Sequence, residues 1–379
     1  MKLKITLLTG VMVFIFWLGN SAFAGNEIPG AADATVQPSD TSKKTPPPPP
    51  AQMLTFPISS ITAKMTLNGY SQVRYQYYLD DKTPSSFDIR NARLILKGTV
   101  LKNVGYNFQC DFAPPTVRLM DASMSYTINK FAKFTAGQQK IPLSYESLRT
   151  DYDIHSVSRS QVVEALTGRS KDVIATASST TAVNNNGRDI GFLFSGSIPN
   201  NNIEGATWVD YYAGVFDGMG INRGDADKAK DFGGRAVVHP IKYLSIGGSF
   251  YEGKATYGGD VTKPKDRNRF GFDAAYEGGK WIYAVVEFLQ GVDSATTKNG
   301  YYAMVEGYFI PQKFSALVKY DFYDPNTNKD DDANTIYSFA LNYYFAKFTK
   351  IQLQYDMRHE NAETQKKNDL LSIQAQVFF

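Results

Sequence analysis

From residue 64 to the C-terminus, apolar and polar residues alternate with a period of two, as side chains do on the two faces of a β-strand. Within residues 351–358, Ile, Leu, Tyr and Met fall on one face, whereas Gln, Gln, Asp and Arg fall on the other. No long segment after residue 63 has the period of an amphipathic helix. The pattern predicts sixteen strands, at residues 64–77, 87–100, 106–112, 119–128, 131–139, 189–198, 207–216, 232–239, 243–251, 269–276, 281–288, 301–309, 314–322, 335–344, 351–358 and 371–379.

The alternation fits two opposite folds. A soluble sandwich turns its apolar face inward, whereas a transmembrane barrel turns it toward lipid and its polar face toward a wet lumen. The connections favour the barrel, because short ones such as 102–105 and 129–130 alternate with long ones such as 217–231 and 252–268. Lipid also requires closure, since an open sheet edge would leave backbone groups unpaired in hydrocarbon. We therefore predict an all-β protein, a transmembrane antiparallel β-barrel of sixteen strands.

The connection at residues 141–187, which we call the third loop, is far longer than the others. Structureless loops of this length are uncommon and are usually functional. A sixteen-stranded barrel is wide enough to leave an aqueous channel. We predict that the third loop folds into the lumen and narrows it; the alternative is an outer flap that stays outside the pore.

The N-terminal part differs in composition from the predicted barrel. Lys2 and Lys4 precede an apolar run at residues 7–18 and the small residues Ala22 and Ala24, which is the order of a secretory signal peptide. Its removal takes away two lysines and lowers the formal charge from +3 to +1. We predict a signal peptide at 1–24, a Pro-rich periplasmic linker at 25–63, with five prolines at 46–50, and an outer-membrane barrel at 64–379. A partner that binds the proline run is the alternative to a plain spacer.

Composition excludes several other classes of protein. A mean hydropathy of −0.31 argues against a helical membrane protein, which needs repeated apolar segments of about 20 residues. The single cysteine and three scattered histidines predict no metal site, and we expect no cofactor. The small net charge argues against a nucleic-acid-binding protein, which usually carries a strongly basic surface. Spacing suggests no catalytic residues, so we expect no enzyme.

The chain ends on Phe379, after apolar residues at alternate positions. A terminal Phe on an amphipathic strand resembles the signal that the bacterial barrel-assembly machinery recognises. This machinery and outer-membrane lipid are therefore expected partners.

Five motifs follow one another along the chain, at residues 87–98 (FDIRNARLILKG), 106–112 (YNFQCDF), 137–146 (GQQKIPLSYE), 187–191 (GRDIG) and 231–240 (DFGGRAVVHP). In this order they are similar to the phosphate-selective porin O and P family of bacterial outer-membrane channels. The resemblance implies a sixteen-stranded barrel in the bacterial outer membrane, a homotrimer, and a third loop inside the lumen. It also implies that lumen arginines and lysines select anions.

Pore charge depends on which basic residues face the lumen. Rings of Arg or Lys favour anions, and Arg can grip phosphate in bidentate fashion. Family motifs, strand parity and the third loop together give these pore-lining or anion-binding candidates: Arg74, Arg93, Lys97, Lys133, Lys140, Arg149, Arg159 and Arg235. Arg90 also matches a family motif, but its parity points away from the lumen and predicts a place at the rim.

The predicted charges do not add up to a positive lumen. By parity, Arg74, Arg93, Lys97, Lys133, Arg235, Arg269, Lys319 and Arg358 oppose Asp111, Asp121, Asp189, Asp210, Asp273, Glu287, Glu306, Asp321 and Asp356, which is 8 against 9. An anion path would then require the basic residues to cluster on one wall of the lumen. We predict a porin for passive diffusion of small hydrophilic solutes, with anions such as phosphate as one hypothesis. The alternative is a barrel with a tethering or loop-borne binding role.

Overall fold

The computed structural model describes residues 54–58, 61–80, 83–173, 184–200, 206–225, 229–255, 264–361 and 367–379. The predicted signal peptide and nearly all of the predicted linker lie outside these residues. The strands are β1 (Leu54–Ile58), β2 (Ile61–Tyr78), β3 (Ser86–Leu101), β4 (Val104–Asp111), β5 (Arg118–Asn129), β6 (Ala132–Lys140), β7 (Arg188–Pro199), β8 (Thr207–Phe216), β9 (Asp231–Ile241), β10 (Leu244–Ala255), β11 (Lys265–Gly278), β12 (Ile282–Asp293), β13 (Thr296–Ile310), β14 (Phe314–Asp324), β15 (Asn334–Ala346), β16 (Thr349–Glu360) and β17 (Leu370–Phe378). In the described part of the chain between β6 and β7 lie two short helices, α2 (Tyr145–Leu148) and α3 (Gln161–Leu166).

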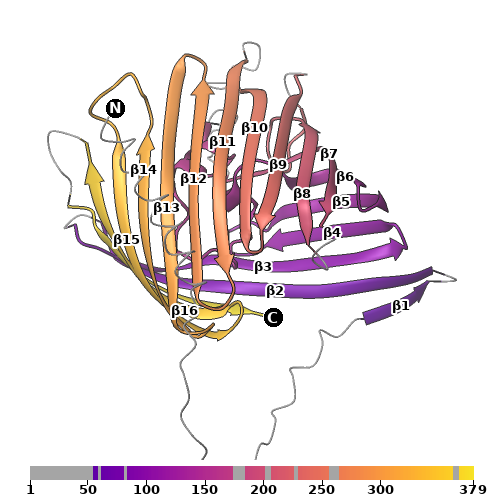
Figure 1. Ribbon diagram of the computed structural model, residues 1–379, viewed down its shortest axis with the longest axis horizontal. Coiled ribbons are helices and arrows are strands. Elements are labelled where there is room, and N and C mark those ends of the chain that lie inside the picture. Colours follow the sequence, from indigo (N-terminus) through magenta and orange to yellow (C-terminus); the bar gives the residue numbers. More distant parts are fainter. Residues whose placement is uncertain are drawn as a thin grey trace, which may run out of the picture. The chain divides into compact units, whose positions relative to one another are not determined.

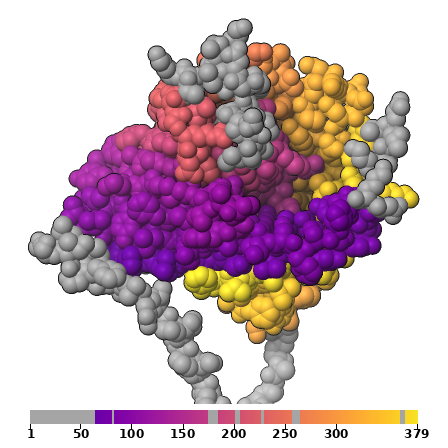
Figure 2. All heavy atoms as spheres, turned by 180° about the vertical axis from the view of Figure 1, so that it is seen from behind, coloured from indigo at the N-terminus to yellow at the C-terminus, as the bar shows by residue number. Residues whose placement is uncertain are grey.

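Strands β2 to β17 form a closed antiparallel barrel of sixteen strands (Figure 1). Each pairs with the next along the chain, and β17 pairs with β2 from Leu370↔Tyr78 to Phe378↔Tyr70. Figure 2 shows the N-terminal strands, in indigo, beside the C-terminal strands, in yellow, where the barrel closes. The predicted fold class is confirmed. Within the described residues, no helix has the length and apolar character needed to cross a membrane.

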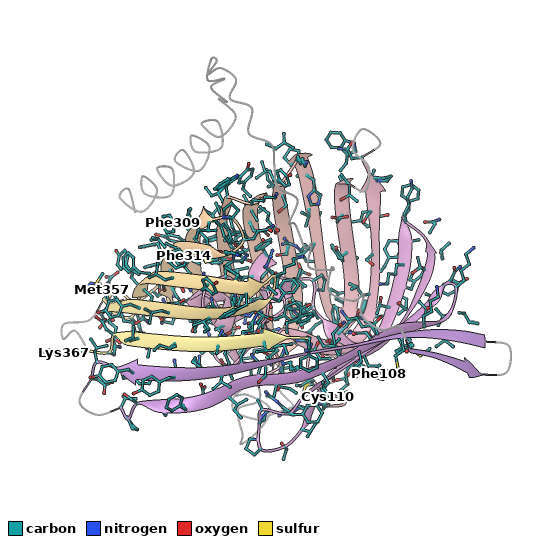
Figure 3. All side chains as sticks on the ribbon, turned by 90° about the horizontal axis from the view of Figure 1, so that it is seen from below. Phe108, Cys110, Phe309, Phe314, Met357 and Lys367 are labelled. Atoms are coloured by element: carbon teal, nitrogen blue, oxygen red, sulfur yellow. The ribbon has the colours of Figure 1, made fainter. Side chains whose placement is uncertain are left out.

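The two faces of the wall differ in polarity as the alternation predicts. Large apolar side chains such as Leu67, Phe272 and Leu353 are exposed on the outer face, although they lie in mid-strand. Their neighbours on the inner face, such as Asp273 and Gln352, are buried. Figure 3 shows Phe309, Phe314 and Met357 on the outer side of the wall. An apolar outer face and a polar inner face are the arrangement that lipid outside and water inside require.

Strand structure begins earlier than the predicted boundary at residue 64. Strand β1 forms a hairpin with β2, from Ile58↔Ile61 to Leu54↔Met65. Strand β17 reaches only Tyr70 on β2, so β1 continues along the edge that β17 leaves free. Residues 54–63, assigned to the linker from the composition of the whole segment, therefore include strand residues. Pro57 is compatible with β1, because Pro is tolerated on an edge strand.

The prediction that Arg90 sits at the rim is wrong. The register between β2 and β3 shifts between Gln72↔Asn91 and Val73↔Ile89, so Arg90 is the extra residue of a β-bulge. Its guanidinium donates hydrogen bonds to the Val157 carbonyl and to Gln374 Oε1, so it points inward. Parity counting fails at a bulge because one strand gains a residue without a partner.

Short turns join β3 to β4, β5 to β6, β9 to β10, β11 to β12, β13 to β14 and β15 to β16. Since consecutive strands are antiparallel, these turns all lie at one end of the barrel, which we call the short-turn end. The third loop leaves β6 at the opposite end. The two cavities described below reach the short-turn end.

Candidate functional site

The third loop is closed at its base by backbone hydrogen bonds. Ile141 N donates to Gly187 O at 2.9 Å, and Gly187 N donates to Gly168 O at 3.3 Å. Gly168 and Gly187 have φ of 67° and 69°, a left-handed conformation that glycine adopts without strain. A Cβ on Gly187 would also lie 2.5 Å from Ser147 Oγ. The two glycines therefore allow the loop to turn back over its own base.

Helix α2 begins and ends on side chains of the GQQKIPLSYE motif. Ser144 Oγ accepts a hydrogen bond from Ser147 N at 3.1 Å, as an N-cap does. Lys140 Nζ donates to the carbonyls of Ser147, Leu148 and Arg149, at 3.0, 2.9 and 2.7 Å. These carbonyls have no partner inside so short a helix. The ammonium group of Lys140, a predicted pore candidate, therefore holds the loop backbone.

Helix α3 packs against the inner face of the wall. Its buried residues Val162, Val163 and Leu166 join a core cluster with residues of β12, β13 and β14, including Leu289 and Tyr302. Gly300 permits this close approach, since a Cβ there would lie 2.8 Å from Val162 Cβ. The described part of the third loop thus lies against inward-facing side chains of one side of the barrel.

Glutamines on the inner wall hold the backbone of the loop between residues 151 and 157. Gln72 of β2 donates to Asp151 O at 3.0 Å, and Gln376 of β17 donates to Tyr152 O at 2.9 Å. On β16, Gln352 donates to His155 O at 2.8 Å, and Gln354 Oε1 accepts from Val157 N at 2.7 Å. We call Gln72, Gln352, Gln354 and Gln376 the glutamine set. It binds the loop through main-chain atoms, so it does not depend on the loop's side chains.

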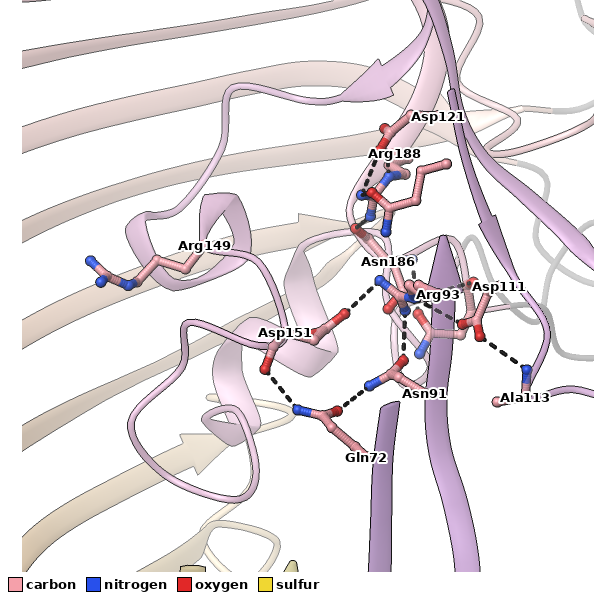
Figure 4. A network of polar contacts seen from close by, with 12 residues as sticks. Gln72, Asn91, Arg93, Asp111, Ala113, Asp121, Arg149, Asp151, Asn186 and Arg188 are labelled. Carbon is pink, nitrogen blue, oxygen red and sulfur yellow. Dashed lines mark hydrogen bonds and ion pairs between the residues drawn. The ribbon is translucent and has the colours of Figure 1, made fainter. Parts of the chain in front are cut away.

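Two candidate arginines meet at one carboxylate of the loop, that of Asp151, and Figure 4 shows its contact with Arg93. Asp151 lies 2.7 Å from Arg93 Nη1 and 2.9 Å from Arg159 Nη2, and all three side chains are buried. Arg93 also pairs with Asp111 at 2.9 Å. Burial alone would raise the pKa of Asp151, but Arg93 and Arg159 hold that pKa well below its usual range. At neutral pH the group is therefore an anion that pairs with arginines from the wall and from the loop.

Three further candidates are also paired with carboxylates of the chain. Arg74 lies 2.6 Å from Asp88, and Arg235 lies 2.6 Å from Asp273. Arg149 pairs with Asp153 at 2.9 Å and with Glu277 at 2.7 Å. Six of the eight predicted candidates are thus engaged in holding the chain together.

The other two candidates are exposed in a cavity on the opposite wall. This cavity of about 700 Å³ lies between the third loop and the inner faces of β3 to β8, and we call it the lysine cavity. Lys97 of β3 and Lys133 of β6 are exposed in it and have no hydrogen-bond or ion-pair partner among the described residues. Of the residues that line it, five are cationic (Lys97, Lys102, Lys133, Lys140 and Arg188) and one, Asp121, is acidic.

Among the described residues that line the lysine cavity, Asp121 is the one carboxylate, and an arginine of the chain neutralises it. Asp121 is bound by Arg188 in bidentate fashion, at 2.8 and 3.0 Å (Figure 4). Glu287 accepts from the backbone of Tyr145 at 2.8 Å, and Asp321 accepts from Gln161 N at 3.0 Å. The count of 8 against 9 therefore does not describe where the charges lie. Acidic lumen residues such as Asp121, Glu287 and Asp321 contact arginines or the loop, whereas Lys97 and Lys133 on one wall have no partner among the described residues.

The sequence prediction did not single out several residues of this site. Arg188 and Lys102 line the lysine cavity, and the glutamine set holds the loop. The glutamines were visible as polar positions at alternate places in the last strands, but an uncharged face gave no reason to expect a role. Within the described ranges, no group of three or more His, Cys, Asp or Glu could hold a metal ion.

Comparison with known proteins agrees with this geometry. The sequence profile described as phosphate-selective porin O and P matches residues 64–268, more than half of the chain. No curated protein matches the chain in sequence.

Solved porin structures share its fold. An anion-selective porin from Comamonas acidovorans superposes with a TM-score of 0.62 and 16% identity, covering 84% of this chain and 100% of that one. The trimer form of OmpT, an outer membrane protein of Vibrio cholerae, gives 0.55 and 12%, covering 84% and 99%. The outer membrane channel DcaP of Acinetobacter baumannii gives 0.57 and 12%, covering 84% and 97%.

Proposed function

Because this chain belongs to the phosphate-selective porin O and P family, we propose that its porin activity is directed to small anions that pass along the lysine cavity. The protein is an outer-membrane porin, a channel rather than an enzyme. Passage through a porin is diffusion down a gradient, so selectivity arises from the charge and width of the wetted path. For this chain, that path is the part of the lumen which the third loop leaves open.

The free lysines on one wall carry the proposal. Lys97 and Lys133 are exposed to the cavity, whereas the lumen arginines discussed above are paired. Asn107, Ser125 and Thr135 supply neutral polar groups around them. At about 5 Å in water, one charge changes the energy of a monovalent ion by roughly 0.8 kcal/mol, with opposite signs for anions and cations. Two lysines together are enough for a clear anion preference.

The same geometry favours selectivity for anions in general over specific binding of phosphate. Bidentate binding of phosphate needs an arginine fork that is not already occupied. Arg74, Arg93 and Arg235 each donate to a carboxylate of the chain itself. Lysine acts as a point charge without a preferred planar partner. We therefore propose that phosphate crosses as one of several small anions.

The test measures reversal potentials in a salt gradient across planar bilayers. The wild-type chain should give stepwise conductance and a potential with the sign of anion preference. Lys97→Gln with Lys133→Gln should lower the anion-to-cation permeability ratio by about tenfold or more, because salt screens only part of the effect of the two charges. Lys280→Gln is the matched control, because Lys280 is exposed in the turn between β11 and β12 and does not line the lysine cavity.

Each outcome bears on the proposal. A cation-preferring wild type, or a double variant whose permeability ratio equals that of Lys280→Gln, would reject the anion path. An absence of conductance steps would contradict a porin altogether.

We further propose that the barrel assembles as a homotrimer in the bacterial outer membrane, as the trimer form of the Vibrio cholerae relative suggests. Size-exclusion chromatography with light scattering in detergent tests this, and a monomer would reject it. We also propose that the barrel-assembly machinery recognises Phe379, which is 63% exposed. Deleting Phe379 should lower the yield of assembled barrel in cells while refolding in detergent stays efficient.

A further inference from the structure

A second cavity lies on the other side of the third loop. It measures about 490 Å³ and is enclosed by residues 152–155 of the loop and by the turns between β11 and β12, β13 and β14, and β15 and β16. Among the described residues, none lines both this cavity and the lysine cavity. We call it the aromatic cavity. The loop therefore separates two compartments at the short-turn end, and their linings differ in chemistry.

Aromatic rings form much of the wall of this cavity, namely those of Tyr152, Tyr283, Tyr308, Tyr344 and Phe348. The His155 ring is stacked on Tyr283, with centroids 3.7 Å apart and planes 4° from parallel. Flat side chains that stack in this way offer faces and edges to a further ring. The lysine cavity, by contrast, is lined mainly by hydroxyls, amides and lysines.

The charges at the aromatic cavity leave an excess of positive charge at its rim. Its two carboxylates, Asp153 and Glu277, both pair with Arg149. Lys313 and Lys347 lie exposed in two different turns, and neither has an ion-pair partner among the described residues. Lys347 Nζ lies 4.9 Å from the Phe348 ring centroid. Positive groups thus stand at the entrance, with rings behind them.

We propose that the aromatic cavity binds a small aromatic anion, with its ring among the tyrosines and its carboxylate or other anionic group toward Lys313 and Lys347. A volume of about 490 Å³ falls within the ordinary range for small-molecule sites. Stacking on the cavity rings favours a ligand with a flat apolar ring, and a lysine at the cavity entrance can pair with the carboxylate of that ligand. This site goes beyond the proposed anion path and does not depend on it.

Isothermal titration calorimetry of the full mature chain in detergent tests the site with 1-naphthoate as the probe. Octanoate keeps the charge without the ring, and 1-naphthalenemethanol keeps the ring without the charge. We expect saturable binding of 1-naphthoate and clearly weaker binding of the other two. Lys313→Gln with Lys347→Gln should weaken 1-naphthoate about tenfold. Tyr308→Leu, which removes one ring of the wall, should weaken it as well.

The controls separate this site from the pore. Lys130→Gln should leave binding unchanged, because Lys130 is a turn lysine that lies 5.3 Å from the Phe131 ring, as Lys347 lies over Phe348, but does not line the cavity. Lys97→Gln with Lys133→Gln should also leave binding unchanged while it alters the reversal potential. Absence of saturable binding, equal binding of octanoate, or loss of binding in either control would overturn the inference.

Discussion

The Arg93 guanidinium of β3 lies 2.7 Å from the Asp151 carboxylate of the third loop, and both side chains are buried. This pair joins the barrel wall to the loop at the place where Gln72 also binds the loop backbone. If Asp151 lost its charge, buried Arg159 would lose its ion-pair partner and Arg93 would keep Asp111 alone. The position of the loop, and with it the width of the open path, therefore depends on this contact.

Neutralising Asp151 should loosen the third loop. Asp151→Asn keeps the shape but removes the charge that Arg93 and Arg159 share, at a cost of about 3 kcal/mol for the broken buried pairs. We expect noisier and larger single-channel currents, and faster cleavage of the loop in limited proteolysis. Asp153→Asn is the matched control, since Asp153 pairs with Arg149 in a more exposed setting. Equal effects of the two variants would contradict the role given to Asp151.

The contacts of Asp151 and Asp172 should hold the loop at neutral pH and fail only in strong acid. Burial would raise the pKa values of Asp151 and Asp172, but the surrounding arginines hold both below the ordinary value of about 3.9. A carboxyl whose folded-state pKa is depressed stabilises the fold above its unfolded pKa, and that stability is lost as pH falls through the folded pKa. The excess current noise of Asp151→Asn over the wild type should therefore persist from pH 7 down to about pH 4 and shrink only below it. Loss of that excess near pH 6 would contradict this assignment.

Gly137 should not tolerate a side chain. Its φ is 114°, and a Cβ there would lie 2.3 Å from the Ala122 carbonyl oxygen of the neighbouring strand. Gly137→Ala should lower the free energy of unfolding by on the order of 2 kcal/mol, measured by urea titration of the refolded barrel. Gly248→Ala is the control, because its nearest neighbour would be the Phe272 side chain at 3.5 Å. Similar unfolding midpoints for both variants would count against strain at Gly137.

A charge on the outer face should cost stability according to its depth. Phe272 is 62% exposed in the middle of β11, whereas Trp281 is 61% exposed in a short turn. Phe272→Arg should destabilise the barrel in lipid vesicles by about 2–4 kcal/mol, and Trp281→Arg by about 1 kcal/mol or less. Equal costs would mean that lipid does not surround the outer face as described.

Phosphate should not block the chloride current at low concentration. The arginines that could grip it, such as Arg93 and Arg235, already bind carboxylates. Micromolar inorganic phosphate should leave the single-channel chloride conductance unchanged, because Lys97 and Lys133 attract it only as point charges. Saturating block in that range would contradict this prediction, because it would require an arginine that is free to bind phosphate.

The alternation of residues from 64 onward predicted the sixteen strands, but it did not choose between a barrel and a soluble sandwich. A strand in a membrane-spanning wall must turn every second side chain to lipid, so each strand carries the pattern by itself. The alternation of short and long connections favoured the barrel, since each end of the barrel meets a different surrounding, although β12 and β13 are joined by a two-residue turn at the end opposite the short-turn end. The alternation within each strand and the length of each connection are local properties, so the sequence of each segment is enough to predict them.

The charge of the pore could not be predicted in this way. Asp151 neutralises Arg93, which is far away in the sequence, and Arg188 neutralises Asp121. A count by parity therefore treats as free those charged side chains that are paired in the fold. The bulge at Arg90 reversed the predicted direction of a side chain, because one inserted residue changes the parity of a strand. Which lysines remain free was decided only when the loop folded against one wall and left the other open. Pairing energy depends on distances between elements far apart in the chain, and only the tertiary structure sets those distances.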